Sequence, residues 1–157
     1  MVSGGSSANF EWLRSTDHIG RINNLRLGES ILLGCEPLHG SPIVGLHHDT
    51  STVFGEVIES KFKPLQPWGD RARTPFVPVC AGDDHGSAWQ SIVAIGHQDT
   101  DPGALRGPAG LRILGASSDH LVVGSDGRLA IGSEIAFRPG YSAFVRAMTA
   151  GLHATVG

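Results

Sequence analysis

The 157-residue sequence has only two lysines, two cysteines and one tyrosine. Lys61 and Lys63 lie close together and the arginines are scattered, so a chain of net charge −3 offers no basic patch for nucleic acid. No apolar run approaches the roughly 20 residues that span a bilayer, which argues against a membrane partner. Cys35 and Cys80 are too far apart for a zinc pair and too few for a disulfide framework, so we expect both to be reduced.

The N-terminal residues also lack the basic charge and the apolar stretch of a secretory signal. The sequence therefore predicts a cytoplasmic protein. Its length and its 40% hydrophobic content suit one globular domain with a core of its own.

Glycine and proline are abundant, with 22 and nine residues, and they interrupt the chain every few positions. This pattern favours short strands and turns over long helices, and so predicts a mainly β fold, a small barrel or sandwich. Strands are expected at residues 22–27, 53–62, 89–95, 111–114, 121–123 and 134–137. A short helix is expected at residues 10–14 and a short helix or turn at residues 29–33, while residues 141–151 suit either a last strand or a short helix.

The clearest strand, residues 53–62, alternates in a way that places Phe54, Ile58 and Phe62 on one face. Glu56 lies between them. If that face is buried, the Glu56 carboxyl has a raised pKa and can act as an acid or base. The alternative is a half-buried face on which Glu56 pairs with an arginine. Further on, residues 125–127 (Ser-Asp-Gly) predict a hairpin turn.

A polar run at the entrance of a predicted strand is the most informative feature. Ser117, Ser118, Asp119 and His120 follow one strand-like stretch and precede another. Asp119 can hold an ammonium group, and His120 can move protons near neutral pH. The alternative is a side-chain cap at the strand entrance, with His120 packed into the sheet.

Histidines gather in three further places. His47 and His48 precede Asp49, His85 follows two aspartates, and His97 lies near Asp99. Convergence of His48, His85 and His97 would suit zinc or iron, but histidines of this kind are more often surface loop residues, and no metal is expected.

Eight stretches in order resemble the C-terminal part of the alanine and ornithine racemase family of fold-type-III pyridoxal-phosphate enzymes. They are residues 3–9, 24–29, 45–49, 55–59, 94–99, 101–102, 115–121 and 141–149. Such enzymes combine a lysine-bearing TIM-type barrel with a C-terminal β domain. The resemblance implies that residues 1–35, including the short helical elements, are a remnant of the barrel end and that residues 36–157 are the β domain.

The same resemblance bears on the cofactor. The Schiff-base lysine of the family lies early in the barrel, whereas Lys61 and Lys63 fall in a strand of the β domain. We therefore expect no pyridoxal phosphate and no other cofactor. Because a partial barrel cannot close, residues 1–35 must pack differently, and we expect a naturally short protein.

Two segments resemble the phosphate-binding parts of the family. Glycine N–H groups, hydroxyls and a following helix N-terminus favour an anion, and the alternative is a flexible N-terminus kept by descent. The residues concerned are Gly4, Gly5, Ser6, Ser7, Arg26 and Gly28.

The resemblance also suggests a substrate site. Ser118 and Asp119 fall where relatives present a small polar residue and an acid across a dimer interface, with Ser117 beside them. Tyr141 resembles a tyrosine that approaches the cofactor, and its phenol can donate to an oxyanion, although a lone tyrosine is commonly a packing residue. Arg146 is a further substrate-binding candidate and His47 a second proton carrier.

Three alternative functions are consistent with these features. The first is an acid–base isomerase, epimerase or cyclase of racemase ancestry, independent of pyridoxal phosphate, that acts on an amino-acid-derived or other small molecule, as in specialised biosynthesis. The second is half of a split racemase, and the third is a small-ligand-binding or regulatory module. A homodimer is expected, because a β domain without its barrel must cover an apolar face.

Overall fold

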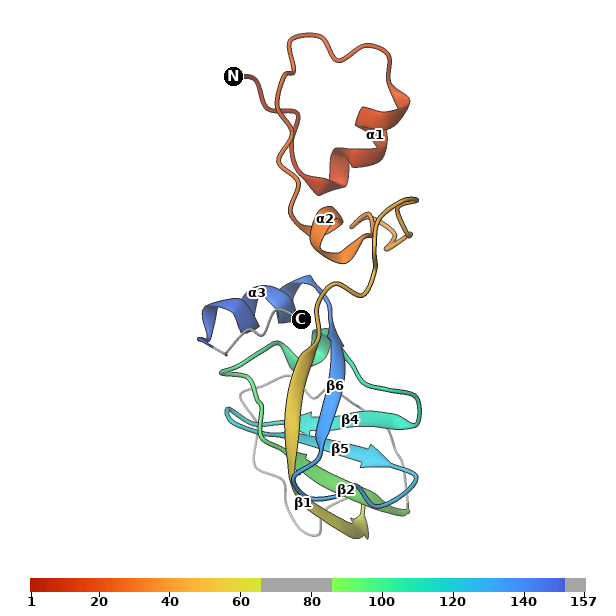
Figure 1. The fold of residues 1–157 in the computed structure, drawn as a ribbon, viewed down its shortest axis with the longest axis vertical. Helices are drawn as coiled ribbons and strands as arrows, with labels where there is room; N and C mark the ends of the chain where they lie inside the picture. The colour runs from red at the N-terminus through yellow and green to blue at the C-terminus, as the bar shows by residue number, and fades with distance from the viewer. Residues whose placement is uncertain (66–85, 152–157) are drawn as a thin grey trace. The chain divides into compact units, whose positions relative to one another are not determined.

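The computed structural model describes residues 1–65 and 86–151, and these form two compact units, residues 1–51 and the β unit that begins at Thr52 (Figure 1). The elements are η1 (Ser7–Asn9), α1 (Phe10–Ser15), α2 (Glu29–Leu33), β1 (Val53–Pro64), β2 (Ser87–Val93), η2 (Pro102–Ala104), β3 (Leu105–Arg106), β4 (Leu111–Ala116), β5 (Leu121–Ser125), β6 (Glu134–Pro139) and α3 (Tyr141–Thr149).

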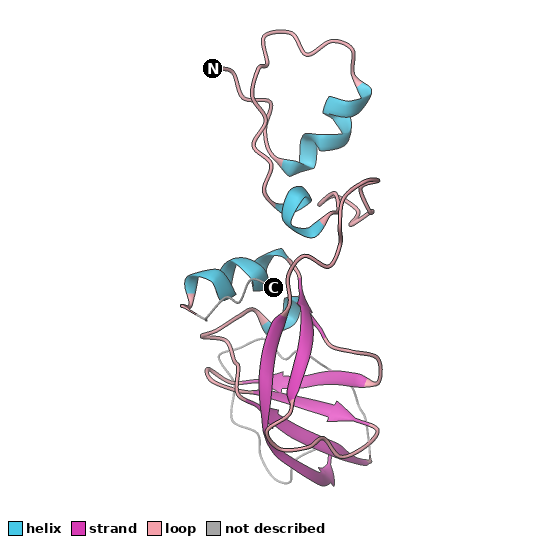
Figure 2. Ribbon diagram, viewed as in Figure 1, coloured by secondary structure: helices cyan, strands magenta, loops and turns pink. Residues whose placement is uncertain are grey.

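The β unit is a single curled sheet with the shape of a half-barrel (Figure 2). Its strand order is β3-β6-β1-β2-β5-β4, and every neighbouring pair is antiparallel. β-Branched residues are frequent in β1, β2 and β5, and their stiff side chains suit a pleated surface. The predicted mainly β fold is confirmed.

The core lies on the inner face of this sheet, where apolar side chains alternate with exposed ones. In β6 the buried residues Ile135, Phe137 and Pro139 alternate with exposed Glu134 and Arg138. The buried hydrophobic cluster comprises Val53, Val57, Val93, Ile95, Leu105, Ile113, Leu121, Val123, Ile135, Phe137, Ala143 and Ala147. The last two belong to α3, so this helix closes part of the core with one face.

The predicted face of β1 is wrong. Val53, Gly55 and Val57 point into the core, whereas Phe54 is 56% exposed and Glu56 is also exposed. Residues two apart in a strand share a face. In β1 the face with the smaller side chains, Val53, Gly55 and Val57, is the one that fits the tight interior. The argument for Glu56 as a buried acid or base therefore loses its basis.

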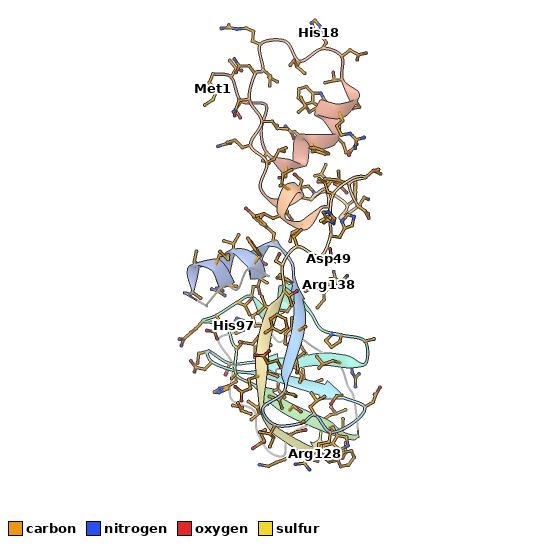
Figure 3. The ribbon with its side chains drawn as sticks, viewed as in Figure 1. Met1, His18, Asp49, His97, Arg128 and Arg138 are labelled. Atoms are coloured by element: carbon orange, nitrogen blue, oxygen red, sulfur yellow. The ribbon has the colours of Figure 1, made fainter. Side chains whose placement is uncertain are left out.

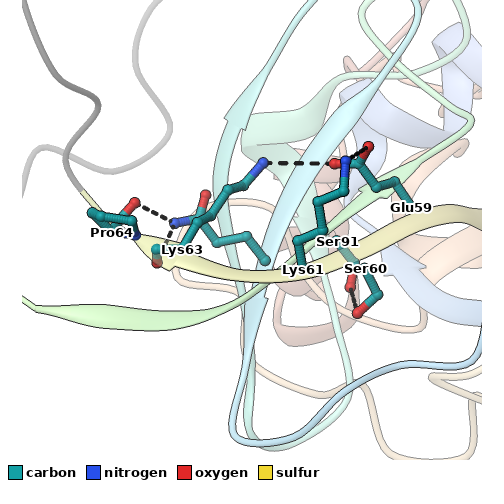
Figure 4. Close-up of polar contacts among 7 residues, drawn as sticks. Glu59, Ser60, Lys61, Lys63, Pro64 and Ser91 are labelled. Atoms are coloured by element: carbon teal, nitrogen blue, oxygen red, sulfur yellow. Dashed lines mark hydrogen bonds and ion pairs between the residues drawn. The ribbon is translucent and has the colours of Figure 1, made fainter.

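A bulge between Val57 and Glu59 then reverses the faces of β1. Ser60 is buried and accepts a hydrogen bond from Ser91 at 2.9 Å (Figure 4). Phe62, which faces Trp89 in a T-shaped ring contact at 5.8 Å, is therefore not on the face of Phe54.

Two other predictions meet different outcomes. Residues 125–127 do turn, with Ser125 Oγ donating to the carbonyl of Gly127, but they do not form a hairpin, because β5 pairs with β2 and β4 while β6 pairs with β1 and β3. Of the two alternatives for the C-terminal stretch, the structure has the helix, α3.

Residues 1–51 contain little regular structure. The predicted strand at 22–27 is reduced to one parallel bridge between Ser3 and Asn24. The predicted helix at 10–14 forms as α1, and of the two alternatives at 29–33 the structure has the helix, α2. Ile43 is the one hydrophobic side chain among these residues that is buried, and Ser7, Ser30 and Glu36 are buried polar residues. The boundary between the two compact units lies between Ser51 and Thr52. The predicted division at residue 35 concerns descent from a barrel, and it stays a prediction.

No helix in residues 1–65 and 86–151 has the length and apolar character required to cross a membrane.

Candidate functional site

The polar run singled out in the sequence is the loop of the β4–β5 hairpin. Ala116 pairs with Leu121, which leaves Ser117, Ser118, Asp119 and His120 as a four-residue connection. Ser117 closes the loop: its N–H donates to the carbonyl of His120 at 2.8 Å, and its Oγ accepts from the N–H of His120 at 3.1 Å. The loop is therefore defined by its own hydrogen bonds.

A second loop, which follows β2, supports this hairpin loop from the side. The N–H groups of His97 and Gln98 donate to the carbonyls of Ser117 and Ser118 at 2.9 and 2.8 Å. Gly96 makes the approach possible, because a Cβ there would lie 2.5 Å from Ser118 O and from His120 N. No side chain larger than hydrogen fits without moving backbone.

Asp119 is exposed at the tip of the loop. Ser118 Oγ donates to Asp119 Oδ2 at 2.6 Å, and within the described residues no cation pairs with this carboxylate. His120 is half-buried beside it. The Ser118 hydroxyl occupies one carboxylate oxygen of this exposed residue, and the other oxygen has the capacity to accept a hydrogen bond from a ligand.

The loop after β2 continues to the start of α3. Asp99 Oδ2 accepts from the N–H of Gly96 at 2.8 Å, and Asp101 Oδ2 accepts from Ser142 Oγ at 2.6 Å. Tyr141 and Arg146 are both exposed residues of α3, and Tyr141 is 40% exposed. The segment after β2 thus contacts both the hairpin loop and the first turn of α3, and Asp119 and Tyr141 share no hydrogen bond within the described residues.

The histidine clusters do not converge in what the structure describes. Within residues 1–65 and 86–151, no group of three His, Cys, Asp or Glu residues could hold a metal ion. His47 and His48 are exposed in residues 1–51, and His97 (labelled in Figure 3) lies in the β unit. His85 and Cys80 lie outside the described residues, and Cys35 is a free cysteine whose pKa is raised, chiefly by burial.

The two segments predicted to bind phosphate lie side by side. Gly4 N–H donates to the carbonyl of Asn24 at 2.8 Å, and Arg26 N–H donates to the carbonyl of Gly5 at 3.0 Å. Gly5 has φ +113°, a conformation that glycine adopts readily. The Arg26 side chain is exposed.

Ser7 is the hub of this pairing rather than a free ligand for an anion. Its Oγ accepts from the N–H of Gly28 at 3.1 Å, and from Ser30 through both N–H and Oγ at 3.2 Å. Ser6 remains exposed, and its side chain caps no helix. Of the predicted anion ligands, Ser7 therefore has a structural role that the pattern did not reveal.

Both lysines of the sequence lie on β1, next to Glu59. Lys61 Nζ lies 2.7 Å from Glu59 Oε2, and Lys63 Nζ lies 3.8 Å from Glu59 Oε1 (Figure 4). The hydrogen bond from Lys61 is the main cause that lowers the pKa of Glu59. Both amines thus lie in surface ion pairs with Glu59 on β1.

Sequence reasoning missed Gly96, Asp99 and Asp101, the residues that support the hairpin loop and α3. Asp101 carried a usable signal: it precedes Pro-Gly, and its Oδ1 accepts from the N–H of Gly103 as in an Asx turn. Nothing in the local sequence marks the close approach at Gly96, because the contacting atoms come from residues more than twenty positions later.

Comparison with known proteins gives two sequence relatives. The chain is 38% identical over 154 residues to ornithine racemase of Acetoanaerobium sticklandii and 36% identical over 152 residues to lysine racemase of Thermotoga maritima. Each match covers 95% of this chain but only 43% of the relative, so the chain spans less than half of their length. No family model matches the sequence.

A solved structure, alanine racemase from Oenococcus oeni, is similar with a TM-score of 0.53 at 20% identity, over 89% of this chain and 39% of that one. At this identity the likeness concerns the fold. Together with the sequence relatives, it confirms the predicted resemblance to the C-terminal part of the alanine and ornithine racemase family, and the β fold of the chain is similar to that part.

Proposed function

We propose that this chain is an amino-acid isomerase that works by acid–base chemistry without pyridoxal phosphate, and that Asp119 binds the ammonium group of its substrate. The observation that carries the proposal is the solvent-facing Asp119 carboxylate on a loop that Gly96 fixes in place. A carboxylate held in this way gives a charge-assisted hydrogen bond with little rearrangement. The names of the relatives, ornithine racemase and lysine racemase, support an amino acid as substrate.

His120 and Tyr141 are the proposed proton-transfer groups. His120 follows Asp119 directly, and an imidazole exchanges protons near neutral pH. Tyr141 can supply a second proton from α3, and Arg146 on the same helix can bind the substrate carboxylate. One group removes the Cα proton and another returns a proton to the opposite face, so the configuration inverts with no net change in atoms. The proposal includes a cytoplasmic location.

A second candidate is a racemase subunit that requires a separate lysine-bearing chain. The observation that favours it is the pairing of residues 3–5 with residues 24–26, which keeps two phosphate-type segments together. The share of the relatives that this chain covers, 43%, also leaves room for a partner. In that case Asp119 has the same role, and the base comes from the other chain.

Chiral chromatography after incubation with L-ornithine, L-lysine and L-alanine tests both candidates. We expect the purified chain to produce the D-enantiomer of at least one of them, and Asp119→Asn to lower the rate by about a hundredfold. Asp126→Asn is the matched control, because Asp126 is an exposed aspartate in the loop after β5 and should leave the rate unchanged.

Three other outcomes would support a different function or contradict the role of Asp119. Activity that appears only after addition of the unmatched part of the A. sticklandii ornithine racemase, together with pyridoxal phosphate, supports the second candidate. Binding that Asp119→Asn weakens, with no product under either condition, identifies a non-catalytic binding module. Equal rates for Asp119→Asn and the parent chain contradict the role given to this carboxylate.

A further inference from the structure

The outer face of β6 and its neighbours carries an unusual charge pattern. Glu134 of β6 lies directly opposite Glu56 of β1, and Arg138 of β6 lies directly opposite Arg106 of β3. All four residues are exposed, and Arg138 is labelled on the β6 ribbon in Figure 3. We call this surface the charged face. Like charges directly opposite in an antiparallel pair destabilise the sheet, so two such pairs call for an explanation.

None of these charges is neutralised within the described residues. No ion pair there involves Glu56, Glu134, Arg106 or Arg138. The two ends also do not neutralise each other, because Arg138 lies four residue positions after Glu134, about 14 Å along the strand, which exceeds a Debye length of about 8 Å at physiological salt. The charged face therefore has a separate acidic end and a separate basic end.

Between the two ends the surface is apolar. Phe54 is 56% exposed and lies opposite Ala136, two residues along each strand from the glutamate pair. The small Ala136 leaves the Phe54 ring uncovered. An exposed aromatic ring flanked by charges is typical of the centre of a protein interface.

We propose that the charged face binds a second copy of this chain through a two-fold axis that runs across the strands at the level of Phe54. Such an axis lays the acidic end of each copy over the basic end of the other, with Glu134 facing Arg138, and brings the two Phe54 rings together. A two-fold axis along the strands would instead place like charges against each other. The pattern is self-complementary in one orientation alone, as an isologous interface requires.

Other occupants fit this pattern less well. A nucleic acid or an acidic partner would be repelled by the glutamate pair, and a basic partner by the arginine pair. The proposal goes beyond the proposed function, because it needs neither Asp119 nor a substrate. It also specifies a surface for the homodimer that the sequence predicts.

Reciprocal charge reversal with sedimentation equilibrium tests the proposal. The parent chain is expected to dimerise, and the dimer to weaken as salt is raised. Two double variants, Glu56→Arg with Glu134→Arg and Arg106→Glu with Arg138→Glu, should each raise the dimer dissociation constant by about tenfold or more. An equimolar mixture of the two variants should restore the dimer, because each then faces its opposite charge.

Phe54→Asn provides a second approach that leaves all charges in place, and it too should weaken the dimer by about tenfold. Circular dichroism checks that each variant keeps its fold, which is expected because every changed residue is exposed. A monomeric parent chain would overturn the proposal, as would a dimer that both double variants retain or a mixture that stays monomeric.

Discussion

Residues 1–51 and the β unit are held together in different ways. The β unit buries a continuous cluster that includes Val57, Leu121 and Phe137, each 0% exposed. Residues 1–51 bury a single hydrophobic side chain, Ile43, and leave Val44 91% exposed. The β unit thus has an apolar core, whereas residues 1–51 have buried polar groups that bind backbone N–H groups.

This difference separates two kinds of stability. Apolar burial is non-directional and cooperative, so the β unit should unfold as a whole. Hydrogen bonds to buried polar atoms contribute little each and fail locally when one partner is lost. The comparison therefore predicts global effects from changes in one region and local effects from changes in the other.

Phe137→Ala should have the largest effect. The side chain is fully buried in β6, and removal of a buried phenylalanine leaves a cavity that costs about 3–5 kcal/mol of unfolding free energy. Urea denaturation measures this cost. Phe54→Ala is the matched control on the paired strand, since Phe54 is 56% exposed, and at concentrations where the chain is monomeric its midpoint should barely move. Equal losses for the two variants would contradict the assignment of the inner face.

Gly96→Ala should come next. The added methyl group would meet backbone atoms of Ser118 and His120 at 2.5 Å, and such overpacking costs about 2–3 kcal/mol. Gly115→Ala is the matched control, because a Cβ at this position would meet no atom within 4 Å apart from its chain neighbours. Urea denaturation and the exchange rates of the His97 and Gln98 amides report the result. Unchanged protection of these amides would show that the hairpin loop does not depend on Gly96.

Ser7→Ala should have a smaller and local effect. Loss of its Oγ leaves the N–H groups of Gly28 and Ser30 without an acceptor, at a cost of about 1–2 kcal/mol. Hydrogen exchange should speed up at these two amides while the β unit keeps its protection. Ser6→Ala, an exposed neighbour, is the control. Loss of protection in β6 as well would mean that the two regions unfold together.

A fall in pH should produce the smallest change in stability, again confined to residues 1–51. The Glu36 carboxylate accepts from the N–H groups of Leu38, His39 and Ser41, and these bonds, Ser41 first, lower its pKa below the ordinary 4.5. Because the folded pKa is below the unfolded one, the stabilisation is present above pH 4.5 and disappears as the pH falls through the folded value.

Amide exchange at Leu38, His39 and Ser41, followed from neutral to acidic pH, measures this loss. Glu36→Gln should remove the pH dependence of these three amides. Protection that persists in acid in the parent chain would contradict the role of the carboxylate.

Local patterns in the sequence predicted the strands of the β unit other than β3, but not their partners. The stretches around Ile113 and Val123 were placed correctly, and with them the loop that carries Asp119, because both stretches are short, β-rich and separated by polar residues. The turn at Asp126 has the right chemistry for a hairpin, yet β5 pairs with β2. Pairing depends on contacts distant in the chain, which no local window contains.

The face of β1 and the support of the Asp119 loop were missed for physical reasons. Alternation in β1 does not say which of its two faces points inward, and the bulge after Val57 then exchanges the faces without any residue type that marks it. Gly96 is one glycine among 22 in the sequence, and only the three-dimensional approach of Ser118 distinguishes it. The position of Asp119 on a hairpin loop was predictable, and the second loop that holds it was not.

The most direct test of the account is a titration of the ¹⁵N-labelled chain with L-ornithine, followed by amide chemical shifts. The account predicts shifts concentrated in residues 117–120 and in residues 96–98 beside them, and predicts that Asp119→Asn abolishes these shifts while Asp126→Asn keeps them. Shifts that lie elsewhere, or that persist in Asp119→Asn, would contradict the claim that this loop binds the substrate's amino group.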